Sequence, residues 1–252
     1  MLAALAVLCA FAWLYLVHLD RQMADGMAAG MVAGKAAMSA AMPMTNAWTA
    51  ADAVSMFLMW AVMMVAMMLP SVSPMVLLYA RTARHRTSLG RTGAPVALFV
   101  TGYLIAWIGF SLLATLVNWA LHRAGFLTSA MGTVTGWISG LVLIAAGVYQ
   151  WTPLKNACLT HCRSPIGFLA DHWREGRAGA ITMGVHHGAY CVGCCWLLMA
   201  LVFVLGVMNL VWIAALTAFV LLEKLGPRGP LVSRLTGGVL VAWGAWLLNV
   251  GT

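Results

Sequence analysis

The chain alternates between long apolar segments and short stretches in which most of its charged residues gather. A helix needs about 20 apolar residues to cross the hydrocarbon core of a bilayer, and several segments approach or exceed that length. The predicted segments are 2–18, 53–78, 96–121, 131–151, 180–205, 208–222 and 235–250. This pattern predicts an all-α fold, a polytopic transmembrane helical bundle of about seven passes, in which residues 1–252 form a single membrane domain.

Composition supports the same class of protein. Hydrophobic residues make up 63% of the chain and charged residues 8%, whereas soluble domains average about 45–50% apolar and about 25% charged residues. No positive residue precedes the first apolar segment, so we interpret that segment as a retained helix rather than a signal peptide. The predicted location is a bacterial inner (cytoplasmic) membrane, with the lipid bilayer as a partner.

The distribution of Lys and Arg predicts the orientation of the chain. Of the 14 basic residues, eleven lie within 79–94, 152–178 and 223–234, and cytoplasmic loops carry such an excess in membrane proteins. The N-terminus is therefore expected in the cytoplasm and the C-terminus on the extracytoplasmic side. The net charge of +8 follows from this topology and from contact with anionic lipid head groups, so it does not indicate a nucleic-acid partner.

Three cysteines, Cys191, Cys194 and Cys195, lie inside a run from residue 179 to residue 222 that contains no charged side chain. On a helix, His187 shares a face with Cys191 and with Cys194 or Cys195, at steps of three or four residues. Ionisable groups at membrane depth are costly and indicate function, although a buried cysteine can also act as a small hydrophobe. Sulfur combined with imidazole favours a soft metal ion, copper as Cu(I), with zinc as the alternative.

A second group of candidate metal ligands, Cys158, His161 and Cys162, lies in the stretch 152–178, which we expect to be a basic cytoplasmic loop. Its spacing is too short for a standard zinc finger, which needs another ligand pair further along the chain. We predict that this group acts jointly with the cysteines of the fifth segment, with His172 as a further contributor. The alternative is a solvated loop with incidental thiols.

Methionines gather in two places along the chain. In the second segment, Met56, Met59, Met63 and Met67 fall within about 80° of arc on a helix. We take Met63 and Met67 as candidate ligands because thioethers are soft, uncharged donors that suit Cu(I). The alternative is adaptable apolar packing. The Met-rich stretch 20–52 is expected to form an extracytoplasmic loop or a surface helix, which would capture a soft metal or contact a partner.

The remaining polar and sulfur-bearing groups receive more modest interpretations. Glu223 and Lys224 end the sixth segment, and we interpret them as an ion pair at the level of the lipid head groups rather than as a proton relay. Cys9 has no partner in the sequence pattern and is assigned to packing. Cys191 and Cys194 also match a Cys-x-x-Cys redox dithiol, but such a dithiol needs an electropositive, partly exposed setting.

Several of these motifs occur together in one known family. The matching residues are 63–71, 161–165, 184–199, 208–212 and the pair at 223–224. This set resembles an uncharacterised family of predicted metal-binding integral membrane proteins that is sometimes labelled copper chaperone. The resemblance implies a helical membrane fold and a metal role, and it implies no particular reaction.

The sequence therefore predicts a metal-binding membrane protein that handles Cu(I), by transport, by delivery or as an accessory subunit of a membrane cuproenzyme. The expected protein partners are a membrane metalloenzyme or other complex subunits. Two alternatives belong to other classes: a membrane thiol-disulfide oxidoreductase working with quinone, and a structural subunit of a larger membrane complex. No residue is assigned a catalytic role, and a non-enzymatic function is favoured.

Overall fold

A computed structural model describes residues 2–32, 49–86, 93–126, 136–206 and 209–250, and every regular element in these ranges is an α-helix. The prediction of an all-α fold is therefore confirmed for the described part of the chain. The helices are α1 (Leu2–Val32), α3 (Ala50–Arg86), α4 (Gly93–Arg123), α5 (Gly136–Tyr149), α6 (Pro153–Arg163), α7 (Pro165–His172), α8 (Gly176–Ala200), α9 (Val202–Leu205), α10 (Leu210–Leu225) and α11 (Gly229–Val250).

The described helices include five that are long and apolar enough to cross a membrane: Ala3–Gln22, Ala50–Arg84, Pro95–Arg123, Gly176–Leu205 and Gly229–Val250. A sixth span results if Trp137–Tyr149 and Pro153–Arg163, which meet at a bend of 64°, count as one broken span. Helix α10 has 16 residues and a length of about 24 Å, less than the hydrocarbon thickness of about 30 Å. The pass count of seven and the orientation of the termini therefore remain predictions.

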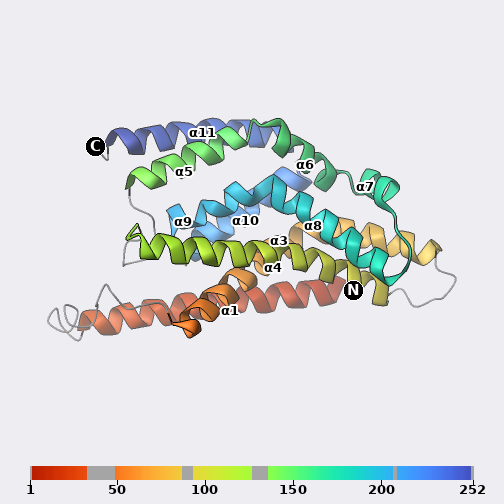
Figure 1. Ribbon diagram of the computed structural model, residues 1–252, viewed down its shortest axis with the longest axis horizontal. Helices are drawn as coiled ribbons and strands as arrows, with labels where there is room; N and C mark the ends of the chain where they lie inside the picture. Colours follow the sequence, from red (N-terminus) through yellow and green to blue (C-terminus); the bar gives the residue numbers. More distant parts are fainter. Residues whose placement is uncertain (1, 33–48, 87–92, 127–135, 207–208, 251–252) are drawn as a thin grey trace.

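The helices run side by side along the long axis of the molecule, with α1 at one edge and the pair α5 and α11 at the other (Figure 1). Between these edges lie α3, α4, α8 and α10, which enclose most of the buried side chains. Figure 1 also shows the chain ends at opposite parts of the bundle, with the N-terminus near the α7 end and the C-terminus far from it. The interior between α3, α4, α8 and α10 is therefore the part of the molecule best shielded from its surroundings.

Glycine allows α4 and α8 to approach each other closely. A Cβ added to Gly184 of α8 would collide with the backbone carbonyl of Phe99 in α4, and one added to Gly102 of α4 would collide with the backbone carbonyl of Ile181 in α8. Small residues at helix interfaces are the usual means of close packing in lipid. This contact brings Tyr103 of α4 against the buried side of α8.

Helix α3 contains two internal prolines, Pro70 and Pro74. A side chain of α1 replaces one of the backbone hydrogen bonds that they remove. Pro70 has no N–H, so the carbonyl of Ala66, four residues earlier, loses its helical hydrogen bond. The indole N–H of Trp13 donates to that carbonyl at 3.2 Å, and the thiol of Cys9 lies 3.7 Å from it. Cys9 thus packs α1 onto α3.

Most of the stretch 152–178, which we predicted as a loop between two membrane segments, is helical and contains α6 and α7. Thr152 caps α6 by accepting a hydrogen bond from the backbone N–H of Lys155, Pro153 stands in the first turn of α6 and Pro165 in the first turn of α7. Both helices bury apolar residues, including Leu159 and Phe168. The sequence pattern did not reveal these helices, because α6 and α7 have only 11 and 8 residues, too few for a clear apolar period.

The Met-rich stretch is also partly helical. Helix α1 continues to Val32, so the first part of the stretch 20–52 is helical, which is one of the two forms that we predicted, and Ala and Met there favour a helix. Residues 33–48 lie outside the described residues. The long apolar run after residue 179 divides as expected. Helix α9 ends at Leu205 and is followed by Gly206, whose φ is +96°, and Asn209 caps α10 by accepting from the N–H of Trp212.

The close packing of α4 on α8 leads to a stability prediction. Gly184→Ala should lower the unfolding temperature of the purified protein in detergent, because a methyl group forced against a backbone carbonyl costs about 1–3 kcal/mol. Gly109→Ala is the matched control in α4, since a Cβ there meets nothing within 4 Å. Thermal unfolding followed by circular dichroism measures both, and equal unfolding temperatures would contradict the interface.

Candidate metal centre

Helix α8 directs three thiols into the bundle. Cys191, Cys194 and Cys195 are between 0% and 2% exposed. The thiols of Cys194 and Cys195 both donate to the backbone carbonyl of Cys191, at 3.1 and 2.9 Å. The three sulfur atoms therefore belong to one turn of α8, on the side that faces the protein interior.

Helix α6 adds two more thiols from a distant part of the sequence. The sulfur of Cys162 lies 3.9 Å from that of Cys194. Cys158 lies beside Gly193, where an added Cβ would come within 2.8 Å of the Cys158 sulfur. The structure thus brings the two predicted cysteine groups together, and all six cysteines of the chain are free thiols.

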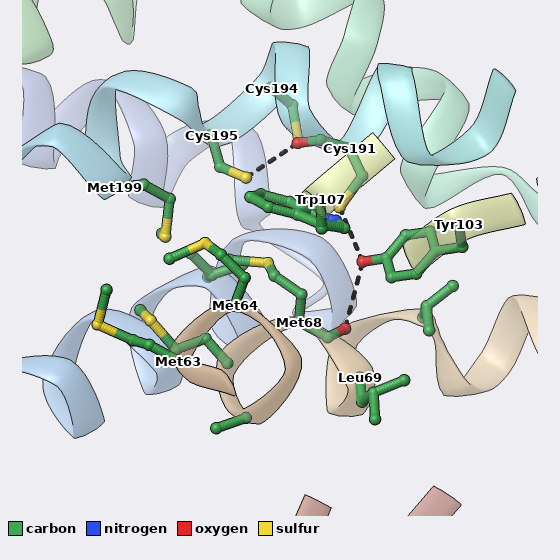
Figure 2. Packing of buried hydrophobic residues seen from close by; sticks show 14 of the residues in the cluster. Met63, Met64, Met68, Leu69, Tyr103, Trp107, Cys191, Cys194, Cys195 and Met199 are labelled. Atoms are coloured by element: carbon green, nitrogen blue, oxygen red, sulfur yellow. Dashed lines mark hydrogen bonds between the residues drawn. The ribbon is translucent and has the colours of Figure 1, made fainter. Parts of the chain in front are cut away.

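Cys191 has two polar partners that the sequence did not suggest. Its sulfur lies 2.8 Å from the ammonium nitrogen of Lys224 in α10 and 3.1 Å from the hydroxyl of Tyr103 in α4. The Tyr103 hydroxyl also donates to the carbonyl of Met68, and Figure 2 shows it between that oxygen and the sulfur. Lys224 makes a second contact at 3.3 Å, to the hydroxyl of Ser71 in α3.

The electrostatic balance of the interior points to a thiolate at Cys191. The buried charged side chains among the described residues are Lys155, Glu223 and Lys224. Lys155 and Glu223 form an ion pair at 2.6 Å, and both side chains are fully buried. The Lys224 ammonium is left beside a sulfur and a neutral hydroxyl, and a buried charge is stable only when it is paired. A thiolate at Cys191 supplies the missing negative charge, and the thiolate is the form of cysteine that ligates metals.

Glu223 and Lys224 do not form the ion pair at head-group level that we predicted. Both are buried and each contacts a different partner, Lys155 and Cys191 respectively. Neighbouring residues on a helix point about 100° apart, so adjacent opposite charges in a sequence need not meet. The signal that could have revealed the site is a lysine at the end of an otherwise apolar helix, because intramembrane charges mark functional sites.

Helix α6 is fastened to the end of α10 by a network of polar contacts. The guanidinium of Arg163 donates to the carbonyls of Glu223 at 2.5 Å and Gly226 at 2.9 Å. Lys155 forms an ion pair with the carboxylate of Glu223 and also donates a hydrogen bond to the side-chain amide oxygen of Gln150. These contacts hold Lys224, in the last turn of α10, at a constant position relative to the cysteines of α6 and α8.

The candidate thioether ligands Met63 and Met67 are fully buried in α3. Two further methionines of α3, Met64 and Met68, are buried as well, together with Met199 of α8, which the sequence did not single out. Figure 2 shows the side chains of Met64, Met68 and Met199 extending into the same part of the interior as the thiol of Cys195. The methionines of α3 and the thiols of α8 therefore belong to the same buried cluster, and adaptable packing remains the alternative role.

Within the part of the chain that the structure describes, the candidate histidines make no hydrogen bond to sulfur. His187 is buried among the rings of Phe99, Tyr103 and Phe168, with centroid distances of 6.2, 6.1 and 5.0 Å. Its Nδ1 is buried and has no hydrogen-bond partner among the described residues. His161 stacks on Tyr190 at 4.3 Å, and its Nδ1 lies 2.9 Å from the carbonyl oxygen of Ala157. The uncommitted nitrogen of His187 makes it the better ligand candidate of the two.

The donor geometry can be tested against the requirements of each metal. Within the described residues, no three His, Cys, Asp or Glu side chains are grouped so as to hold a metal ion. The closest sulfur pair, Cys162 and Cys194 at 3.9 Å, can share one ion without backbone movement, since two metal–sulfur bonds of about 2.3 Å span up to about 4.6 Å. Structural zinc requires four ligands in a tetrahedron. The donors present therefore fit Cu(I), which accepts few and soft ligands, better than zinc.

Comparison with known proteins places these residues in a family. A family described as copper chaperone (PpoB2) matches residues 57–247 of this chain, a range from α3 to α11 that includes every cysteine and buried lysine discussed above except Cys9. No curated protein and no solved structure matches the chain. The family that the sequence motifs resemble is therefore confirmed, and it associates the chain with copper.

The buried ion pair of α6 and α10 leads to a second stability prediction. Glu223→Gln should destabilise the folded protein by about 3–5 kcal/mol, because it leaves the Lys155 ammonium buried without an opposite charge. The double variant Lys155→Met with Glu223→Leu should recover most of that loss, because it leaves neither charge. Chemical unfolding in detergent measures the free energy of unfolding of each variant. A double variant that is less stable than Glu223→Gln would contradict the Lys155–Glu223 ion pair.

Proposed function

Because the chain belongs to the copper chaperone family, we propose that it binds Cu(I) as cargo within its membrane-embedded helices and delivers it to a membrane cuproenzyme. The proposed ligands are Cys191 and Cys194 of α8 and Cys162 of α6, with Cys195, Cys158 and His187 as further donors. The observation that carries this proposal is the 3.9 Å separation between the sulfurs of Cys162 and Cys194. Two helices from separate parts of the sequence bring soft donors together, Cys194 fully buried and Cys162 half-buried.

The surroundings of the thiols suit a carrier of a soft monovalent ion. Burial excludes water and keeps harder ligands away, while the Lys224 ammonium favours a thiolate at Cys191. Several thiols within one turn allow an ion to be exchanged from sulfur to sulfur. A site with few strong ligands can also release its metal to a better one, which delivery requires.

We further propose that the buried methionines form an approach path for the ion. Met63 and Met67, with their neighbours Met64 and Met68, supply neutral thioethers that leave no unpaired charge when the ion is absent. Met199 continues this series on α8, near Cys195. The long apolar helices support an integral location, and we propose the bacterial inner membrane, where the recipient metalloenzyme or complex subunit would also lie.

One alternative function is supported by the same sulfur pair. Cys162 and Cys194 are free thiols at 3.9 Å, and a disulfide requires about 2.05 Å between the sulfurs. A modest approach of α6 to α8 would allow both thiols to lose a proton and an electron to a quinone. The oxidoreductase hypothesis requires reversible disulfide formation, whereas the copper hypothesis requires the thiols to stay reduced.

The copper proposal predicts the metal content of the purified protein. Protein isolated anaerobically from copper-supplied cells should contain stoichiometric copper by elemental analysis, because its thiolates retain Cu(I). The double variant Cys162→Ser with Cys194→Ser should lose that copper, while Cys9→Ser, which alters the thiol packed on α3, should keep it. Retained copper in the double variant would remove these cysteines from the site, and a copper-free protein bound to one stable partner would favour a structural subunit.

The two functions also differ in the state of the thiols in cells. Rapid acid quenching followed by alkylation and mass spectrometry should find Cys162 and Cys194 reduced during growth with quinones either oxidised or reduced. A Cys162–Cys194 disulfide that follows the quinone state would instead establish the oxidoreductase. The control is Cys9, a half-buried thiol on α1 away from this pair, whose alkylation should not change with quinone state.

A further inference from the structure

We propose that His161, His172 and His186 form a second copper site beside the thiol centre, in which two of the three imidazoles bind one Cu(I) ion at a time. We call these residues the histidine group, and they come from α6, α7 and α8 respectively. This inference rests on the proposed function and deepens it, because it identifies a place where the ion binds before it reaches the thiols.

The spacing of the rings is the first support. The centroids of His161 and His172 are 6.2 Å apart, and those of His172 and His186 are 5.9 Å apart. With metal–nitrogen bonds of about 2.0–2.1 Å, and a ring nitrogen about 1.1 Å from the centroid, two imidazoles on one ion have centroids up to about 6.4 Å apart. Both pairs are just within this limit, so one ion can hold two rings on nearly opposite sides.

This geometry fits a metal that needs few ligands. Among the described His, Cys, Asp and Glu side chains, no three are grouped so as to hold a metal ion, so the histidine group offers ligands in pairs. His172 belongs to both pairs. Cu(I) accepts few ligands, whereas structural zinc requires four, so the histidine group suits Cu(I).

The state of the ring nitrogens is the second support. Nδ1 of His161 lies 2.9 Å from the carbonyl oxygen of Ala157, and it carries the proton because a carbonyl only accepts. Its Nε2 then has a free lone pair, and metal-binding histidines commonly donate their other ring N–H to a backbone carbonyl in this way. Nδ1 of His172 is buried and has no hydrogen-bond partner among the described residues. A buried polar atom without a partner is costly, and a bound ion gives it one.

Aromatic stacking holds two of the three rings in place. His161 stacks on Tyr190, with centroids 4.3 Å apart and planes inclined by 6°, and His172 stacks on Phe168 at 4.8 Å and 7°. Stacking occupies the faces of the rings, whereas the nitrogen lone pairs lie in the ring planes, so the ring edges stay available to a ligand. His186 is exposed, and its ring can turn toward His172 as an ion binds.

The histidine group and the thiol centre lie on the same part of α6 and α8. His161 precedes Cys162 in the sequence, and Tyr190, on which His161 stacks, precedes Cys191. Adjacent residues on a helix point about 100° apart, so imidazoles and thiols face different sides and form separate sites. A thiolate is a softer ligand than an imidazole and holds Cu(I) more strongly. Transfer from the histidine group to the thiols is therefore favourable, and the histidine group loads the thiol centre.

The test compares the first and second equivalents of Cu(I) bound by the full-length protein in detergent under anaerobic conditions. X-ray absorption identifies the ligands, because metal–sulfur bonds of about 2.3 Å are longer than metal–nitrogen bonds of about 2.0–2.1 Å. The first equivalent should have sulfur ligands only. The second should have two nitrogen ligands.

Two variants remove the second site by different routes. His172→Phe keeps a ring stacked on Phe168 and removes the histidine common to both pairs, so it should lose the second equivalent, keep the first and fill its thiols several-fold more slowly. The double variant His161→Gln with His186→Gln should do the same while His172 remains. His18→Gln, which removes a histidine of α1, is the control and should bind both equivalents. Thermal unfolding of each variant separates a lost fold from a lost site.

The possible results separate this inference from the proposed function. If the second, nitrogen-bound equivalent never appears in the wild-type protein, persists in His172→Phe or is lost equally in His18→Gln, the histidine site is overturned while copper binding by the thiols stands. Thiols that fill at the wild-type rate in both folded variants would overturn the loading role. Nitrogen-bound copper without any sulfur-bound copper would instead overturn the proposed function itself.

Discussion

The contact between the Lys224 ammonium and the Cys191 sulfur is the interaction on which the rest of the centre depends. A positive charge inside a helical bundle is stable only beside a negative one, and Glu223 is already committed to Lys155. The sulfur of Cys191 is thereby favoured as a thiolate in the protein interior. Its neighbours on α8, Cys194 and Cys195, then lie next to a preformed soft anion rather than in an ordinary apolar core.

Helix α6 gives this centre its second side. It brings Cys162 to Cys194 and Cys158 to Gly193, and its Arg163 holds the end of the helix that carries Lys224. One short helix therefore positions both the additional sulfur ligands and the charge. The glycine contacts of α4 with α8 complete the enclosure by placing Tyr103 on Cys191. The proposed metal ligands and the buried charges beside them are consequently one packed unit.

Much of the fold could be predicted from the apolar pattern, because long helices such as α3, α4 and α8 are recognisable from the length and composition of their apolar segments. The helices within 152–178 could not, since α6 and α7 have only 11 and 8 residues and α6 also mixes Cys, His and Lys with few apolar residues. The thiols of α8 were recognisable from their spacing within an uncharged run. Lys224 and Tyr103 were not, because no spacing rule links residues that meet only through the packing of separate helices.

The sequence by itself determined the helical membrane class, the family and the inward-facing row of Cys191, Cys194 and Cys195, since hydrophobic length and helical periodicity are local properties. Tertiary structure alone decided which side chains meet those sulfurs. Adjacent Glu223 and Lys224 point about 100° apart on α10, so each pairs with the helix that packs on its own side. The packing of the surrounding helices determines which group lies beside a buried charge. It places the Lys224 ammonium on the Cys191 sulfur, so that a row of thiols lies next to a positive charge.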